Sequence, residues 1–213
     1  MSEKTKLLNE AVGVIERELA VFGIRKSRSF YTCAIDRNVS GWVGLNFTKS
    51  RSDGRVGINP IVGVRNESVE SLVERLSNQA GARPAATLSI SLGYLMPEKR
   101  YLEWLFEPEP TFDYVSEAKK VATAIEVYGL PFMKTNATLG AVIENLEHLR
   151  FSFKESAVYR LPVAYLLAGK PDLVAKYVSG QLEALGARQD DAALQYRVFG
   201  TALLEEAMEQ VKQ

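Results

Sequence analysis

The sequence contains few of the residues that build disulfides and metal centres. Among its 213 residues there is one cysteine, Cys33, and one histidine, His148. A disulfide scaffold needs more than one cysteine, and a zinc site made of several His or Cys side chains cannot form from this set. Any nucleophile that relied on a histidine base would have to use His148.

Long apolar runs and a strongly biased composition are also absent. No apolar stretch approaches the roughly 18 residues that suggest a membrane span, and the opening segment MSEKTKLL is polar, unlike a signal peptide. The 15 glycines and 8 prolines are too few for a collagenous or low-complexity chain, and 46% apolar residues exclude a disordered one. We expect a soluble, cytoplasmic protein that does not bind membranes.

The motifs of nucleotide-binding and hydrolase sites are missing as well. There is no Gly-x-x-x-x-Gly-Lys-Ser/Thr, no Gly-x-Gly-x-x-Gly after a strand and no Gly-x-Ser-x-Gly. Asp113 with Glu117 and Lys119 has the letters of a metal-dependent nuclease, but its periodicity is helical, and the acidic stretch 103–109 contains a proline that favours a surface turn. We expect no catalytic residue, no metal and no cofactor.

Two kinds of periodicity divide the chain. Residues 7–21 repeat apolar side chains at helical spacing, and residues 29–64 hold three β-rich segments separated by turn residues such as Asp53-Gly54. These segments predict a first helix and three antiparallel strands. Pro60 lacks an N–H, so we expect the third strand to lie at an edge or to break there.

The rest of the chain adds two strands and then becomes helical. A short helix is expected over 66–78, and alternating apolar residues predict strands within 87–95 and 101–107. Helical segments follow near 112–128, 138–150, 155–168, 172–185 and 191–211. Gly169 and Pro171 predict the turn of a helical hairpin, and Gly186 a helix end.

The predicted fold class is α+β, with an N-terminal helix and a five-stranded, largely antiparallel sheet, followed by a C-terminal helical subdomain. The change of periodicity places the division between residues 1–110 and residues 111–213. We expect the two parts to pack into one compact unit.

Charge is unevenly distributed although 26 basic residues balance 26 acidic ones. Between Arg25 and Arg55 there are seven basic and two acidic residues, a local excess of +5. If the hairpin strands pair, basic side chains gather at one end of the sheet and favour an anionic partner. The candidate binding residues are Arg25, Lys26, Arg28, Lys49, Arg51 and Arg55. The alternative is that they are solvated hairpin ends that balance the acidic stretch 98–117.

The aromatic residues near this basic region allow two interpretations. Tyr31, Trp42 and Phe47 alternate with the cations as stacking platforms for bases would, but such aromatics are more often sheet core. A net charge of zero is unusual for a nucleic-acid binder. We therefore favour a polypeptide partner with an acidic surface over nucleic acid. Cys33, in an apolar segment, is expected to be inert and buried in the core, and His148 to cap a helix end.

Three short segments resemble a bacterial family that is catalogued only as a domain of unknown function. They are Phe22–Phe30 (FGIRKSRSF), Leu45–Arg51 (LNFTKSR) and Val56–Pro60 (VGINP). Family members place a Gly-hydrophobic-Lys-Lys-like turn before a strand, then an Asn-Phe-x-Lys-Ser strand end and a hydrophobic-Asn strand. Here Arg25 replaces a commoner lysine and Ser27 a commoner glycine. The resemblance implies a fold and a basic motif but no reaction.

Taken with this resemblance, the sequence predicts a non-catalytic bacterial binding protein. Some small α+β bacterial proteins of this appearance act as immunity or defence-associated partners, which suggests that context by analogy. The first alternative is a nucleic-acid-binding module that uses the basic region 25–55. The second is a metal-dependent, nuclease-like enzyme.

Overall fold

The computed structural model describes residues 3–48, 55–77, 84–107, 109 and 111–212. The chain forms two compact units of mutually contacting segments. Unit 1 comprises Met1–Val64 and Ser89–Ala137, and unit 2 comprises Arg65–Leu88 and Thr138–Gln213. The division expected after residue 110 separates a sheet-rich part from a helical part of the chain, and it stays a prediction.

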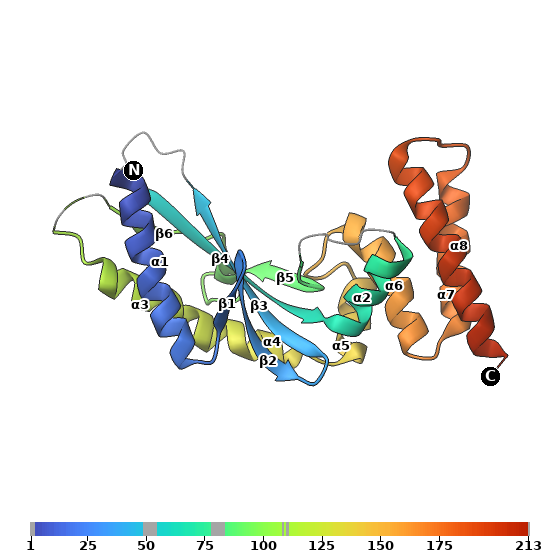
Figure 1. The fold of residues 1–213 in the computed structure, drawn as a ribbon, viewed down its shortest axis with the longest axis horizontal. Coiled ribbons are helices and arrows are strands. Elements are labelled where there is room, and N and C mark those ends of the chain that lie inside the picture. The colour runs from blue at the N-terminus through green and yellow to red at the C-terminus, as the bar shows by residue number, and fades with distance from the viewer. Residues whose placement is uncertain (1–2, 49–54, 78–83, 108, 110, 213) are drawn as a thin grey trace. The chain divides into compact units, whose positions relative to one another are not determined.

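Most of an antiparallel sheet lies in unit 1. Within the described residues its strands are β1 (Arg25–Ser27), β2 (Phe30–Asp36), β3 (Val39–Thr48), β4 (Val56–Asn66), β5 (Leu88–Ser91) and β6 (Trp104–Phe106). Their order is β1-β2-β3-β4-β5, and β6 pairs with the start of β4 (Figure 1). The predicted α+β class is confirmed. Strand β1 was not predicted from the sequence, because its three mostly polar residues have no alternating apolar pattern.

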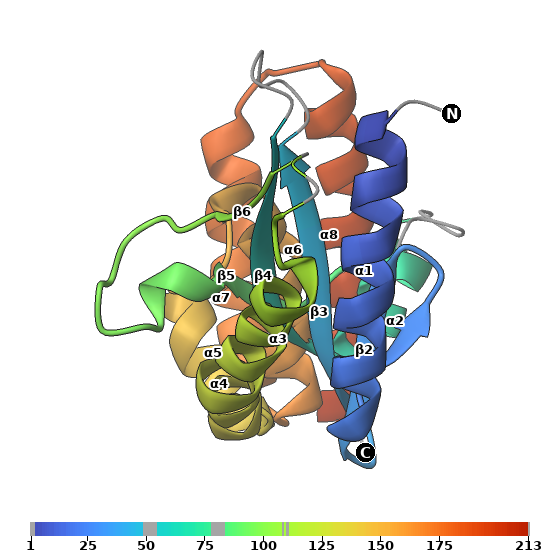
Figure 2. The same ribbon diagram turned by 90° about the vertical axis from the view of Figure 1, so that its left-hand side faces the viewer.

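Helices of unit 1 pack on this sheet. They are α1 (Glu3–Val21), the 3₁₀ turn η1 (Leu92–Tyr94), α3 (Tyr114–Ala124), the π-helical turn η2 (Ile125–Gly129) and α4 (Leu130–Thr135). Figures 1 and 2 show α1 and α3 side by side, and both contact β6. The apolar spacing predicts a buried face with Leu8, Val12, Ile15 and Leu19. Ile15 and Leu19 are buried as predicted, whereas Leu8 and Val12 are half-buried.

Two expectations about the strands are corrected by the structure. Pro60 lies inside β4, which has neighbours on both sides, so the strand neither ends there nor lies at an edge. The β6 ladder covers only Val56–Ile58, so the missing N–H lies beyond that ladder. The strand expected within 87–95 ends at Ser91, where η1 begins. The turn predicted at Asp53-Gly54 lies outside the described residues.

Unit 2 is helical. It contains α2 (Glu67–Leu76), α5 (Leu139–Glu147), α6 (Lys154–Leu167), α7 (Pro171–Leu185) and α8 (Asp191–Val211). Helix α6 contacts α2, α5, α7 and α8, so it is the centre of the unit. The predicted hairpin turn between α6 and α7 is confirmed, with Gly169 at φ +68°. No helix in the described part of the chain is long and apolar enough to cross a membrane.

Gly93 provides a test of the packing around η1. A Cβ atom there would lie 2.3 Å from the carbonyl oxygen of Arg100, a backbone atom that cannot rotate away. We expect Gly93→Ala to lower the free energy of unfolding by about 2–3 kcal/mol, measured by urea denaturation. In Gly13→Ala the added atom would meet only Arg17 Nη1, at 3.7 Å, so this helical control should gain up to about 1 kcal/mol. Equal effects of the two substitutions would contradict this packing.

Candidate binding site

Three of the predicted basic residues lie together in one hairpin of unit 1. Arg25 and Lys26 belong to β1, which pairs with β2, and Arg28 lies in the turn between the two strands. All three are exposed. We call Arg25, Lys26 and Arg28 the basic hairpin. Within the described residues β1 has no neighbour other than β2, so it forms an edge of the sheet.

The remaining candidates are not brought to this hairpin by any described contact. Lys49 and Arg51 lie outside the described residues. Arg55 is placed immediately before β4, and its Nε lies 3.5 Å from Glu107 Oε1. The proposal that all six cations form one patch therefore stays a prediction.

Alternation along β1 directs its cations to opposite faces of the sheet. Arg25 is paired with Thr32 and Lys26 with Tyr31. Successive side chains of a strand point to opposite faces. Lys26 lies on the face covered by α1, where its Nζ donates to Glu16 Oε1 at 2.7 Å. The basic hairpin is therefore a charged edge of the sheet and not a charged face.

Arg28 has an unusual backbone conformation. The pairing of Ser27 with Phe30 leaves two residues, Arg28 and Ser29, in the turn. Arg28 has φ +60°, a region where glycine or asparagine is the usual choice and where a long side chain costs on the order of 1 kcal/mol. Arg25 and Arg28 form no ion pair with any carboxylate among the described residues. The tight turn therefore holds uncompensated positive charge at the tip of the edge.

Glu16 connects the hairpin to α1. Besides Lys26, the hydroxyl of Tyr31 donates to Glu16 Oε1 at 2.9 Å. Burial raises the pKa of Glu16, but the hydrogen bonds from Lys26 and Tyr31 and the charge of Lys26 outweigh burial, so the pKa lies below its ordinary value. Burial, with the neighbouring carboxylate, raises the pKa of Tyr31 above its ordinary range. Glu16 is therefore ionised and Tyr31 neutral near pH 7.

Two of the three predicted stacking aromatics are engaged within the fold. Tyr31 is buried, and Trp42 stacks on Phe30 with ring centroids 5.9 Å apart. The Trp42 ring lies over Gly44, where a Cβ atom would come within 2.6 Å of it. Phe47 is exposed, at 37%. Of the three aromatic side chains, Phe47 is therefore the exposed one, and the choice between a polypeptide and a nucleic-acid partner stays a prediction.

The residues of the nuclease hypothesis have local structural roles. Asp113 is the N-cap of α3 and accepts a hydrogen bond from the Ser116 N–H. Glu117 pairs with Lys120 at 2.8 Å, and Lys119 lies 3.9 Å from Glu18 Oε1. The described part of the chain holds no group of three or more His, Cys, Asp or Glu residues placed to bind a metal ion.

Neither Cys33 nor His148 belongs to the basic hairpin. Cys33, in β2, is half-buried, so its expected place in the core is corrected, because residues of β2 beyond Tyr31 are partly exposed. Partial burial still raises the pKa of its thiol. A thiol with a raised pKa forms little thiolate, which agrees with the expected inert role. His148 is the C-cap of α5, and its Nδ1 lies 2.8 Å from the Glu144 carbonyl oxygen, as a helix-capping histidine would.

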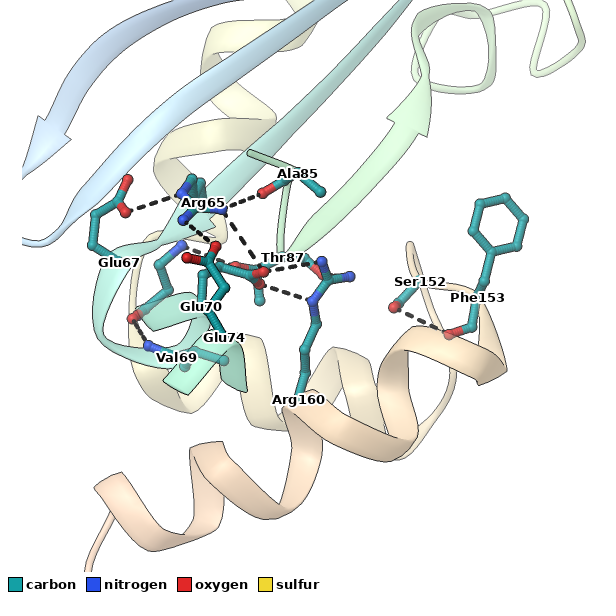
Figure 3. Close-up of polar contacts among 11 residues, drawn as sticks. Arg65, Glu67, Val69, Glu70, Glu74, Ala85, Thr87, Ser152, Phe153 and Arg160 are labelled. Carbon is teal, nitrogen blue, oxygen red and sulfur yellow. Dashed lines mark hydrogen bonds and ion pairs between the residues drawn. The ribbon is translucent and has the colours of Figure 1, made fainter. Parts of the chain in front are cut away.

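A cluster of buried charges in unit 2 was not predicted from the sequence (Figure 3). Glu70 of α2 is 4% exposed and lies between two guanidinium groups. Arg160 of α6 contacts both of its carboxylate oxygens, at 2.8 and 3.1 Å, and Arg65 approaches to 3.8 Å. The Thr87 hydroxyl donates to Glu70 Oε1 at 2.7 Å and accepts from the Asn66 N–H.

Arg65 extends the cluster along α2 and to residues 84–87. It donates to Glu67 and Glu74 at 2.9 and 3.0 Å and to the Ala85 carbonyl at 3.0 Å. Burial lowers the pKa of Arg65, but its hydrogen bonds to Glu74 and Glu67 raise it above its ordinary range, so it stays charged. Each of the carboxylates that surround Arg65 has a donor. The cluster is therefore a structural joint that fixes α2 on α6.

Removing the central carboxylate tests this joint. Glu70→Ala would leave two buried guanidinium groups without their shared partner, so the free energy of unfolding should fall by about 3–5 kcal/mol. Glu67→Ala, at a half-exposed position, should cost less than about 1 kcal/mol. Urea denaturation followed by circular dichroism measures both. Equal losses in the two variants would contradict the structural role of Glu70.

The contact between Lys26 and Glu16 predicts a pH dependence. Because its pKa in the folded chain is lowered, Glu16 contributes stability above about pH 4.5, and this is lost as the pH falls through the folded-state pKa. Lys26→Ala should raise the Glu16 pKa, since burial remains after the donor is removed. An NMR titration of the Glu16 side chain measures the shift. Arg25→Ala, on the opposite face, should leave the Glu16 pKa unchanged. A Glu16 pKa that is the same in Lys26→Ala as in the wild type would refute the contact.

Comparisons of the chain with protein-family models, with curated proteins and with solved structures find no match. The resemblance of residues 22–60 to a bacterial family therefore stays a hypothesis.

Proposed function

We propose that the chain is a non-catalytic binding protein that recognises a polypeptide with an acidic surface through the basic hairpin. The observation that carries this proposal is Arg28, held at φ +60° in a two-residue turn at the tip of an edge strand. A costly backbone conformation persists only where the surrounding structure enforces it, and such positions cluster at binding sites. In this turn the strained conformation places the cation of Arg28 in solvent.

The exposed edge of the sheet determines how the proposed partner would bind. β1 pairs with β2 alone among the described strands, so its outer backbone groups face away from the sheet. An extended segment of a partner can add to such an edge through main-chain hydrogen bonds. Positive charges on an edge strand repel indiscriminate pairing, and Arg25 and Arg28 would select an acidic segment.

Charge at such a site acts mainly on the rate of encounter. Exposed cations steer an acidic partner toward the hairpin, while buried anchors set the lifetime of the complex. Lys26 contributes less to this field because its charge is balanced by Glu16. A bacterial immunity or defence context for the partner is proposed from the sequence resemblance alone.

The experiment first captures the partner and then measures the contribution of the hairpin. A photo-crosslinking amino acid at position 29, in the exposed turn, should trap a polypeptide, and the same group at Asn38 in the next hairpin should not. With the purified partner, Arg25→Glu/Arg28→Glu should slow association about tenfold or more at low salt. Arg37→Glu, exposed at the other turn, is the matched control and should change it little.

Two results would reject the proposal. One is crosslinking at position 29 to nucleic acid, with an affinity that falls steeply between about 50 and 200 mM salt. The other is an association rate that Arg25→Glu/Arg28→Glu and Arg37→Glu change equally. The first result would favour the alternative nucleic-acid-binding module.

A further inference from the structure

A groove runs between α2, α6 and α8 of unit 2. Its volume is about 630 Å³, within the range of sites that hold small ligands or a few side chains. Leu72 of α2 and Leu166 and Leu167 at the end of α6 form its apolar lining. Ser68 and Ser71 of α2 add hydroxyl groups along one wall.

The charged groups at the groove are mainly acidic. Arg75 of α2 and Glu206 of α8 meet at 2.8 Å, but Arg75 is exposed and Glu206 only half-buried, so this ion pair stabilises the groove weakly. Glu209, which is exposed, adds a second carboxylate beside Gln210. Two carboxylates against one guanidinium leave a net charge of −1 at the groove. Its chemistry fits an apolar side chain with a cation next to it.

The loop between α5 and α6 carries such a group. Phe153, immediately before α6, is 78% exposed, and Leu149 is 49% exposed. Figure 3 shows the Phe153 side chain projecting away from the start of α6. Arg150 and Lys154, both exposed, flank it in the sequence Arg-Phe-Ser-Phe-Lys.

The backbone of this loop is strained. Leu149 has φ +51° and Phe151 φ +58°, in a region that bulky side chains rarely occupy. Two such residues within three positions require the loop to be held in one conformation. The result is a preformed projection, and preformed projections lose little conformational freedom on binding.

We infer that the Arg150–Lys154 segment of one copy of this chain docks in the α2–α6–α8 groove of a second copy. Phe153 meets the leucine lining, and Lys154 meets Glu209. This choice of occupant is supported by the match of an exposed phenylalanine and lysine with an apolar lining and an excess of carboxylate. The contact involves unit 2 only and is independent of the basic hairpin.

The occupant must come from another molecule. Lys154 begins α6, and Leu166 lies twelve residues later in the same helix, a rise of about 18 Å. A rigid helix keeps the loop of one copy away from its own groove. If the two α6 helices run antiparallel about a two-fold axis, each loop lies by the groove of the other copy, and the contact closes as a dimer.

Sedimentation velocity of the full chain, from about 1 to 500 µM, tests the inference. The wild-type protein should show a reversible monomer–dimer equilibrium. Phe153→Ser, at an exposed position that folding does not need, should raise the dimer dissociation constant about tenfold or more. Lys154→Glu and Glu209→Lys should each weaken the dimer, and the double variant should recover most of the loss.

Val198→Ser is the matched control, because Val198 is 58% exposed on α8 and does not line the groove. It should leave the equilibrium unchanged. The inference is overturned by a wild-type chain that stays monomeric throughout, by Phe153→Ser dimerising like wild type, or by charge reversals without mutual rescue. A loss in Val198→Ser as large as that in Phe153→Ser would also overturn it, by placing the interface elsewhere.

Discussion

A carboxylate removed from water must be surrounded by donors, and unit 2 is arranged so that Glu70 meets this requirement. Its partners come from separate parts of the chain: Arg65 at the end of β4, Thr87 before β5, and Arg160 in α6. A buried charge with all partners in place adds little net stability, but it penalises any arrangement in which one partner is missing. The requirement therefore fixes how α2 lies on α6, and with it the walls of the groove that α2 shares with α6 and α8.

The element types could be predicted from the sequence, because they depend on local patterns. Apolar spacing predicts α1, and Gly169 and Pro171 predict the turn between α6 and α7. The Glu70 cluster could not be predicted in this way, because Glu70 and Arg160 are ninety residues apart and no local pattern pairs them. Glu70 is one of four charged residues in α2 and does not stand out there. The available signal was Arg160, the one charged residue between Ala157 and Ala168. Such a residue indicates that a partner exists but does not identify it.

The candidate site was predicted in part. The cations of the basic hairpin follow from composition, whereas their division between two faces follows from the pairing of β1, which the sequence did not reveal. Had β1 been recognised, the period of two would have separated Arg25 from Lys26. The positive φ of Arg28 had no signal, because arginine is not a residue that turn chemistry selects there.

Unit 2 is made of two stretches of chain, 65–88 and 138–213, separated by 49 residues that belong to unit 1. During synthesis at about 5–20 residues per second, α2 is complete on the order of 3–13 s before synthesis of α5 begins. Throughout this interval Glu70 has Arg65 and Thr87 nearby in the sequence but lacks Arg160, and Val69 and Leu76 have no helix to pack against. Unit 1 can fold first on the ribosome, while α2 remains an exposed amphipathic segment of the kind that chaperones bind.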